Sequence, residues 1–234
     1  MDEYNSQNGE KKSYKLMTNK KVAILIPTYN STSAKLFDQW IQLGAWADKN
    51  NVKVISVYNR THNDARNWLA TGGAGFMNPG LMLSLFDTFV WIDSDMKFDT
   101  NQVENLIQHD HPFVSGVYYK TDNTGTVKEV MAARWDEEKF LMTGRMNFLQ
   151  EDEIKKAKSP IQVSYCGFGF CKTDVSLFQK MAYPYFTNKR VTIEKEKQSF
   201  TENASEDVSF CLDSPVKPVI DPNIILGHVK EYIL

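Results

Sequence analysis

The chain has 234 residues, of which 42% are hydrophobic and 24% are charged, as in ordinary globular proteins. This composition excludes a wholly disordered chain, and the length predicts one α/β domain rather than two. With a net charge of −2 and no arginine-rich run, the sequence lacks the basic face that binds nucleic acid.

The beginning of the chain is polar. Residues 1–19 contain no apolar stretch like that of a secretory signal, so we expect a mobile tail followed by a single domain over 20–234. No apolar run approaches the roughly 20 residues that span a bilayer. Three cysteines, which have neither zinc-site spacing nor the density of a disulfide scaffold, are expected to be reduced packing residues: Cys166, Cys171 and Cys211. These features predict a cytoplasmic protein without a membrane span.

The first half of the chain alternates predicted strands and helices. Val22–Ile26 is a continuous apolar, β-branched run, typical of a central parallel strand buried on both faces. Residues 34–48 carry apolar side chains at three- and four-residue spacing, which predicts an amphipathic helix. Further strands are predicted at 52–58 and 88–92, and further helices at 63–70, at 79–86 and from a cap at Thr100. This order predicts right-handed crossovers and a doubly wound, Rossmann-like, mostly parallel sheet flanked by helices, with a ligand crevice beyond the carboxyl ends of the strands.

The second half of the chain breaks this alternation. After a predicted strand at 113–119, Asp122-Asn123-Thr124-Gly125 lies between two strand-like segments, as a hairpin turn does. Short helices are predicted at 174–181 and 206–212. Residues 185–203 are polar, charge-rich and without a clear period, which is typical of a mobile functional loop. We therefore expect a smaller antiparallel part beside the main sheet.

The most informative residues are Asp93-Ser94-Asp95, which follow the apolar strand 88–92 directly. Two carboxylates at the end of a buried strand are unfavourable unless something compensates their charge. A hard divalent cation does so, because Mg²⁺ and Mn²⁺ take oxygen ligands and keep positions open for phosphate. The alternative is a strand-to-loop cap solvated by water, since Asp-x-Asp is a common triplet.

Six short motifs follow one another along the chain: Pro27-Thr28-Tyr29-Asn30, Ala65-Arg66-Asn67, Asp93-Ser94-Asp95, Gly167-Phe168-Gly169-Phe170, Glu206-Asp207 and Gly227-His228. In this order they resemble the motifs of GT-A fold glycosyltransferases, and the resemblance covers residues 21–230. It implies a GT-A-like mixed sheet with a smaller antiparallel acceptor-side part. It also implies a metal-dependent hexosyltransferase, which moves a sugar from a UDP- or GDP-sugar to a hydroxyl of a glycan, a glycoprotein or a small acceptor.

The resemblance further implies a donor-binding surface. Pro27, Thr28, Tyr29 and Asn30 match the loop that holds the nucleoside, where the Tyr29 ring would pack on the base. Arg66 matches an arginine that reaches the nucleotide, and its planar fork suits phosphate or carboxylate. A turn aromatic and a surface helix arginine are the alternatives for Tyr29 and Arg66.

A metal centre is implied as well. Asp95 matches the direct ligand of Mn²⁺ or Mg²⁺, and Asp93 matches the residue that touches the ribose and the metal shell, with Ser94 between them on the donor side. His228 matches a third ligand found in many members of the family. Without the resemblance, a lone histidine is more often a packing or surface residue.

On the acceptor side, Glu206 and Asp207 match the acidic pair that opens a helix. Asp207 would then be the general base of an inverting enzyme, or would orient the acceptor in a retaining one. Acidic residues are also favoured at a helix N-terminus by the macrodipole alone, and both explanations can hold together. The resemblance also implies that Gly167, Phe168 and Gly169 belong to a loop under the acceptor, with Trp135 as a possible sugar-stacking neighbour. The alternative for either aromatic residue is a place in the core.

One motif of the family is absent. Many members carry an Asp-Asp pair after the second strand that reads the base, whereas this chain has Asn59-Arg60-Thr61-His62-Asn63-Asp64, in which Asp64 is no more than a possible substitute. A sugar nucleotidyltransferase is the nearest alternative enzyme, but its expected glycine-rich loop is missing after the first strand. A non-catalytic nucleotide- or carbohydrate-binding module is the alternative from another class, and it would need neither Asp95 nor Asp207.

Overall fold

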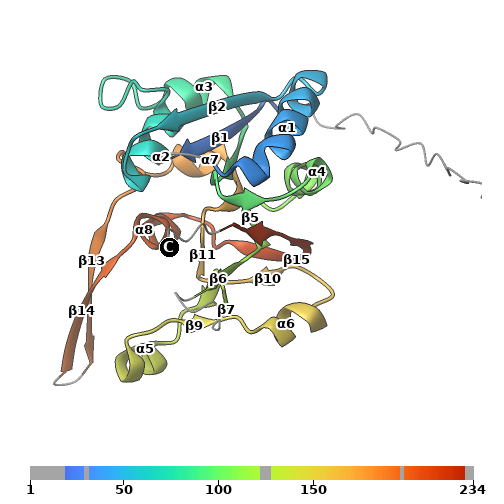
Figure 1. Ribbon diagram of the computed structural model, residues 1–234. Helices are drawn as coiled ribbons and strands as arrows, with labels where there is room; N and C mark the ends of the chain where they lie inside the picture. The colour runs from blue at the N-terminus through green and yellow to red at the C-terminus, as the bar shows by residue number, and fades with distance from the viewer. Residues whose placement is uncertain (1–18, 29–31, 122–127, 196–197, 230–234) are drawn as a thin grey trace, which may run out of the picture.

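A seven-stranded mixed sheet runs through the centre of the protein, as the computed structural model shows for residues 19–28, 32–121, 128–195 and 198–229 (Figure 1). In spatial order the strands are β10 (Ile161–Gln162), β15 (Val219–Ile225), β5 (Phe113–Val117), β12 (Phe170–Asp174), β3 (Thr88–Ile92), β1 (Val22–Thr28) and β2 (Lys53–Tyr58). β1 is parallel to β2 and β3, and β15 is parallel to β5. Because β12 is antiparallel to both β3 and β5, the strands β1, β2, β3, β5 and β15 share one direction. The predicted mostly parallel α/β sheet is confirmed.

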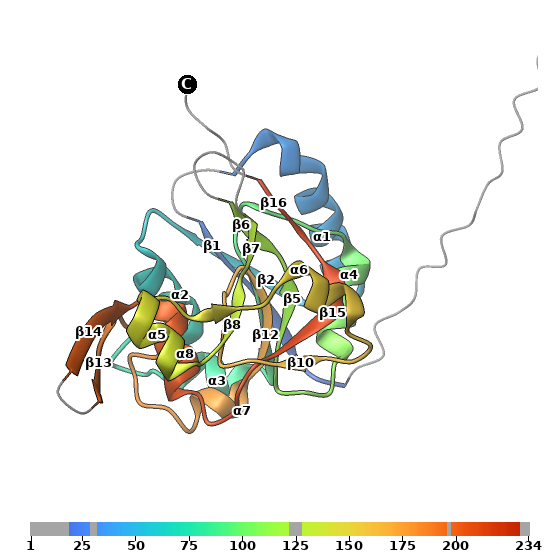
Figure 2. The ribbon, with the colours of Figure 1, turned by 90° about the horizontal axis from the view of Figure 1, so that it is seen from below.

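Side chains from the two faces of the sheet fill two buried layers. Along β1, Ala23 and Leu25 point into one layer, whereas Val22, Ile24 and Ile26 point into the other. This alternation buries both faces, as expected for a central parallel strand. Helices α2 (His62–Thr71), α3 (Leu81–Leu85), α7 (Val175–Phe178) and α8 (Glu206–Asp213) cover the first layer, while α1 (Phe37–Lys49) and α4 (Thr100–Gln108) cover the second (Figure 2).

Most predicted helices form close to their expected places, but the start of α4 differs. The cap is Asp99 rather than Thr100, because Asp99 has the extended backbone of a cap and its carboxylate accepts from the Gln102 N–H at 2.9 Å. The Gln102 side chain in turn accepts from the Asp99 N–H at 2.9 Å, which completes a capping box. A short 3₁₀ turn, η1 (Ala34–Leu36), precedes α1. In the described parts of the chain, every helix is too short or too polar to cross a lipid bilayer.

A smaller part, mostly antiparallel, extends to the bottom of Figure 1, which confirms the predicted change of pattern. The expected hairpin turn at 122–125 lies outside the described residues, but the strands on either side of it do pair antiparallel. The elements here are β6 (Tyr119–Thr121), β7 (Lys128–Val130), β8 (Ala132–Arg134), β9 (Asn147–Phe148), β11 (Tyr165–Cys166), α5 (Glu137–Thr143) and α6 (Glu151–Lys156). A two-stranded ladder joins β4 (Met96–Lys97) to β16 (Gly227–His228).

The prediction of an irregular loop over 185–203 is wrong. Its larger part forms a long hairpin of β13 (Lys189–Lys195) and β14 (Gln198–Ala204), which extends away from the body of the protein (Figure 1). The sequence of this segment is so rich in charged residues that its apolar side chains show no clear period. In the hairpin, Ile193 of β13 lies opposite Phe200 of β14. The Phe200 ring packs edge-on against Phe140 of α5, with 5.3 Å between ring centroids. A cross-strand apolar pair and this contact stabilise a hairpin despite the polar composition.

Candidate functional site

The carboxyl ends of β1, β2 and β3 meet at one edge of the sheet because the three strands are parallel. Thr28 ends β1 and lies beside Tyr58 of β2, while Pro27 is buried just before it. Tyr29 and Asn30, the other predicted donor-loop residues, lie outside the described residues. Of the predicted donor-loop residues, Pro27 and Thr28 therefore lie at the edge where β3 also ends.

The Asp93-Ser94-Asp95 segment forms a turn directly after β3. The Asp93 N–H donates to the Gly169 carbonyl at 2.9 Å, and the Met96 N–H closes the turn on the Asp93 carbonyl at 3.1 Å. The two carboxylates then have different partners. Asp93 contacts Arg66 of α2, whereas Asp95 contacts His228 of β16.

Arg66 links two carboxylates from different elements. Its Nη2 atom lies 3.0 and 3.2 Å from the two carboxylate oxygens of Asp93, and its Nη1 atom donates to Oε1 of Glu206 at the start of α8. The side chain is only 3% exposed. The predicted Arg66, Asp93 and Glu206 thus form one charged group, since buried charges require partners.

Burial and charge act against each other within this group. Burial raises the pKa of the Asp93 carboxyl, Arg66 opposes this shift, and the neighbouring carboxylate of Asp95 adds to it. For Arg66, burial acts to lower the pKa, but the carboxylates of Asp93 and Glu206 outweigh it and the pKa is raised. The Arg66 guanidinium therefore remains charged, and its charge opposes the rise in the pKa of Asp93.

Asp95 and His228 meet although 133 residues separate them in the chain. Oδ2 of Asp95 lies 2.9 Å from Nε2 of His228, and the two side chains are 51% and 20% exposed. The β4–β16 ladder sets His228 opposite Met96, and the Val229 N–H donates to the Asp95 carbonyl at 2.8 Å. Backbone pairing therefore fixes this contact at the open edge of the sheet.

Both ring nitrogens of His228 lie near oxygen atoms. Its Nδ1 atom lies 3.3 Å from the Tyr119 carbonyl, so both ring nitrogens face oxygen acceptors, whereas a neutral imidazole carries one N–H. A divalent cation between Nε2 and the carboxylate would satisfy both groups, and Mn²⁺ accepts both ligand types.

The predicted set of three ligands is only partly assembled. Asp95 and His228 lie together, whereas Asp93 is paired with Arg66. Among the residues that the structure describes, no group of three or more His, Cys, Asp or Glu side chains is arranged to hold a metal ion.

Asp207 lies at the start of α8 next to Glu206, as predicted. Its Oδ2 atom accepts from the Tyr165 hydroxyl at 3.1 Å, while Oδ1 accepts from the Ser205 hydroxyl and, at 2.8 Å, from the Val208 N–H. Burial raises the pKa of Tyr165, and the Asp207 carboxylate adds to the shift, so this phenol stays protonated and keeps donating. These donors orient the carboxylate.

The predicted acceptor loop is divided between the core and the site. Phe168 is 1% exposed, and its ring lies under Arg66, 5.6 Å from the guanidinium, so it is a core residue. Gly169 accepts the Asp93 N–H and donates its own N–H to the Tyr118 hydroxyl at 3.0 Å. Gly167 also lies against Tyr118. The loop therefore positions Asp93.

Trp135 is accessible, as a sugar-stacking residue must be. Its side chain is 44% exposed, and its ring lies 5.1 Å from the ring of Phe140. The backbone N–H of Trp135 donates to the hydroxyl of Ser164, the residue before Tyr165.

Two site residues have no signal in the sequence. Tyr118 and Tyr165 both occur in short apolar segments, where an aromatic residue reads as core. Each is indeed largely buried, at 6% and 5% exposed, and only the tertiary contacts reveal that their hydroxyl groups hold Gly169 and Asp207.

No protein-family model and no curated protein sequence matches this chain. Among solved structures, the fold is similar to that of A197 from STIV, with a TM-score of 0.50 and 18% sequence identity. The similarity covers 92% of this chain and 96% of that chain. At this identity it concerns the fold alone, because one fold hosts many functions.

Proposed function

We propose that this protein is a metal-dependent glycosyltransferase with a GT-A-like fold that uses a nucleotide-diphosphate sugar as donor. The observation that carries the proposal is the 2.9 Å contact between Asp95 and His228. The resemblance implies that both residues are metal ligands, and their side chains lie together at the carboxyl end of β3, where ligands bind in open α/β sheets.

In this proposal Asp95 and His228 hold Mn²⁺ or Mg²⁺. When bound, such a cation neutralises the charge that develops on the departing nucleoside diphosphate. Arg66, which also pairs with Glu206, keeps Asp93 in place at the edge where Thr28 ends β1. The carboxylate of Asp93 is thereby available to a ribose hydroxyl at the end of the sheet.

Asp207 acts on the acceptor. The bond between the anomeric carbon and the diphosphate oxygen breaks as the acceptor oxygen bonds to that carbon, and Asp207 takes the hydroxyl proton in an inverting reaction. Oδ2 is the oxygen with fewer hydrogen bonds and has lone pairs left for this proton. In a retaining reaction the same carboxylate would orient the acceptor.

Metal-dependent donor binding tests the proposal. Calorimetry with UDP-glucose and GDP-mannose, each with and without Mn²⁺, should show binding of at least one donor that requires the metal. Asp95→Asn should weaken this binding about 100-fold or more, because loss of a ligand exceeds the 10- to 100-fold typical of outer-shell changes.

Asp48→Asn is the matched control, since Asp48 is an exposed carboxylate on α1. Circular dichroism should show that both variants keep the fold. Unchanged metal-dependent affinity in Asp95→Asn, or no metal-dependent binding in the wild type, would contradict the proposal.

A further inference from the structure

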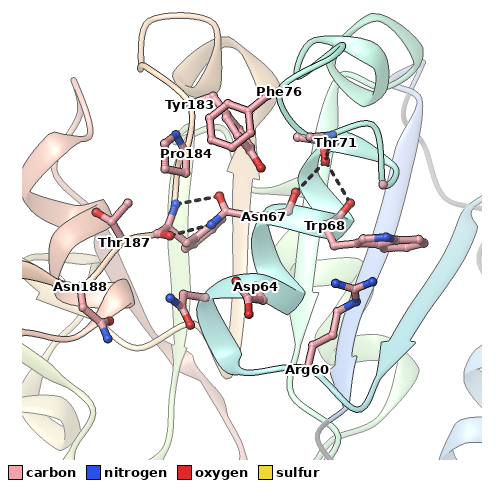
Figure 3. A pocket seen from close by; sticks show the side chains of 14 residues that line it. Arg60, Asp64, Asn67, Trp68, Thr71, Phe76, Tyr183, Pro184, Thr187 and Asn188 are labelled. Atoms are coloured by element: carbon pink, nitrogen blue, oxygen red, sulfur yellow. Dashed lines mark hydrogen bonds between the residues drawn. The ribbon is translucent and has the colours of Figure 1, made fainter.

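A pocket of about 510 Å³ lies on a different face of α2 from Arg66 (Figure 3). Its walls come from α2, from the glycine-rich turn that follows α2, and from residues 183–188 before β13. Phe76 and Tyr183 lie at one end of the pocket and Arg60 lies at the other, with Asn67 and Trp68 between them (Figure 3). The volume is within the range typical of small-molecule sites.

The walls are held together before any ligand binds. The Asn67 side chain donates to the Phe186 carbonyl at 2.6 Å and accepts from the Phe186 N–H at 3.0 Å, which joins α2 to the segment before β13. Gly73, with a φ of +81°, lies so close to Trp68 that a Cβ atom would be 2.8 Å from the indole nitrogen. These contacts make the pocket a preformed site.

The pocket offers aromatic surface to a ligand. The Phe76 side chain is 82% exposed, yet its ring is fixed edge-on against Tyr183, with 4.8 Å between centroids. Trp68 lines the same pocket and carries the Arg60 guanidinium 5.8 Å from its ring centroid. The exposed Phe76 ring and the half-buried Trp68 ring suit the C–H faces of a ring-shaped ligand, because an aromatic face is electron-rich.

Polar groups complete the wall. One oxygen of Asn63 and one of Asp64 accept from the Thr61 hydroxyl, at 2.8 and 2.9 Å, so within the described part of the chain the Asn63 amide hydrogens and the second Asp64 oxygen are left for a ligand. Thr187 and the exposed Asn188 lie opposite. The carboxylate of Asp64 disfavours a phosphate group, and together with Arg60 it leaves the lining without net charge.

We propose that this pocket binds a short neutral saccharide, whose C–H faces stack on Phe76 and Trp68 and whose hydroxyls bond to Asn63, Asp64 and Asn188. This combination of aromatic faces with amide and carboxylate groups matches a ligand that is apolar on one face and rich in hydroxyls at its edge. The proposal does not depend on glycosyl transfer, because the pocket includes neither Asp95 nor His228.

Saturation-transfer difference NMR with maltose, cellobiose, lactose and N,N′-diacetylchitobiose tests it, without metal or nucleotide. At least one sugar should receive saturation from the protein, and Phe76→Ala and Asn188→Ala should each weaken its binding about tenfold or more. Phe37→Ala, which removes an exposed aromatic residue on α1, should leave the affinity unchanged.

Asp95→Asn should also bind the sugar as the wild type does, so loss of the proposed transferase activity and loss of this site are separate results. Absence of saturation transfer to all four sugars would overturn the proposal. Wild-type affinity in both Phe76→Ala and Asn188→Ala would overturn it as well, because binding would then occur elsewhere.

Discussion

Arg66 shows how one side chain can organise a site built from distant segments. Its two terminal nitrogens contact two different carboxylates, Asp93 and Glu206, which a lysine with a single charged nitrogen could not hold in the same geometry. Its Nε is buried and has no hydrogen-bond partner among the described residues, and its guanidinium lies over the Phe168 ring. Arg66 therefore compensates the charge of the site on the side away from Asp95.

At the same scale, Asp207→Asn tests the role of the acceptor-side carboxylate. We expect turnover of the bound nucleotide sugar, measured as release of nucleoside diphosphate, to fall roughly 10²- to 10⁴-fold with nearly unchanged donor affinity. The fold should survive, because Asn keeps the size of Asp and the N-cap of α8 is Ser205, which the substitution leaves in place.

Tyr165→Phe is the companion variant. It removes only the hydroxyl that donates to Oδ2 of Asp207, so it should reduce turnover less than Asp207→Asn does. Near-normal turnover by Asp207→Asn would exclude Asp207 and direct attention to Glu206. NMR of the product anomer would show whether the reaction inverts or retains.

Among the elements, the loop before β12 is fixed by close packing. A Cβ atom on Gly167 would lie 2.1 Å from the Tyr118 hydroxyl oxygen, with the ring carbon Cζ at 3.2 Å. On Gly169 it would lie 2.8 Å from Cζ and 2.9 Å from the hydroxyl oxygen. Glycine is thus required at both positions, at the first by the hydroxyl and at the second by the ring itself.

This difference gives a prediction with a built-in control. Gly167→Ala and Gly169→Ala should each destabilise the protein by about 1–3 kcal/mol through overpacking. Tyr118→Phe should recover much of the loss in Gly167→Ala but little in Gly169→Ala, because the ring remains. Urea unfolding of the single and double variants measures both couplings, and equal rescue of the two alanines would contradict the packing account.

At the scale of the whole molecule, buried charge also lies toward the other end of the strands, where the parallel strands begin. Lys172 of β12 is fully buried, lies 3.6 Å from Asp174 and donates to the His109 carbonyl. Burial lowers the pKa of His109, and the charges of Lys172 and His111 lower it further. The carboxylates of Asp221 and Asp110 oppose this shift without cancelling it. His109 also accepts the His111 N–H on Nδ1 at 3.1 Å, which requires that nitrogen to be unprotonated.

The stability of the protein should therefore fall on mild acidification. A lowered pKa in the folded state means that the unfolded chain binds the proton first, so His109 costs stability as the pH drops through the ordinary histidine pKa of about 6.5. His109→Asn keeps an acceptor for the His111 N–H but cannot titrate. Urea unfolding between pH 7.5 and 5.5 should show a smaller loss in this variant, and equal losses would contradict the assignment.

Much of the architecture follows from local pattern. The apolar runs at 22–26 and 88–92 and the helical period over 34–48 predict β1, β3 and α1, because a buried strand or an amphipathic helix needs that spacing whatever its neighbours are. The hairpin β13–β14 was missed, since its stability depends on a cross-strand pair and on Phe140 from another segment.

The candidate site divides in the same way. The sequence by itself singled out Asp93, Asp95, Asp207 and His228 as candidate site residues, because the motifs around them are local. Tertiary structure alone decided that Asp95 lies beside His228, 133 residues away, and that Arg66 holds Glu206, 140 residues away. Such contacts depend on how strands and helices pack, which no local spacing specifies. For the same reason, the roles of Tyr118 and Tyr165 and the pocket beside α2 emerge only from the folded chain.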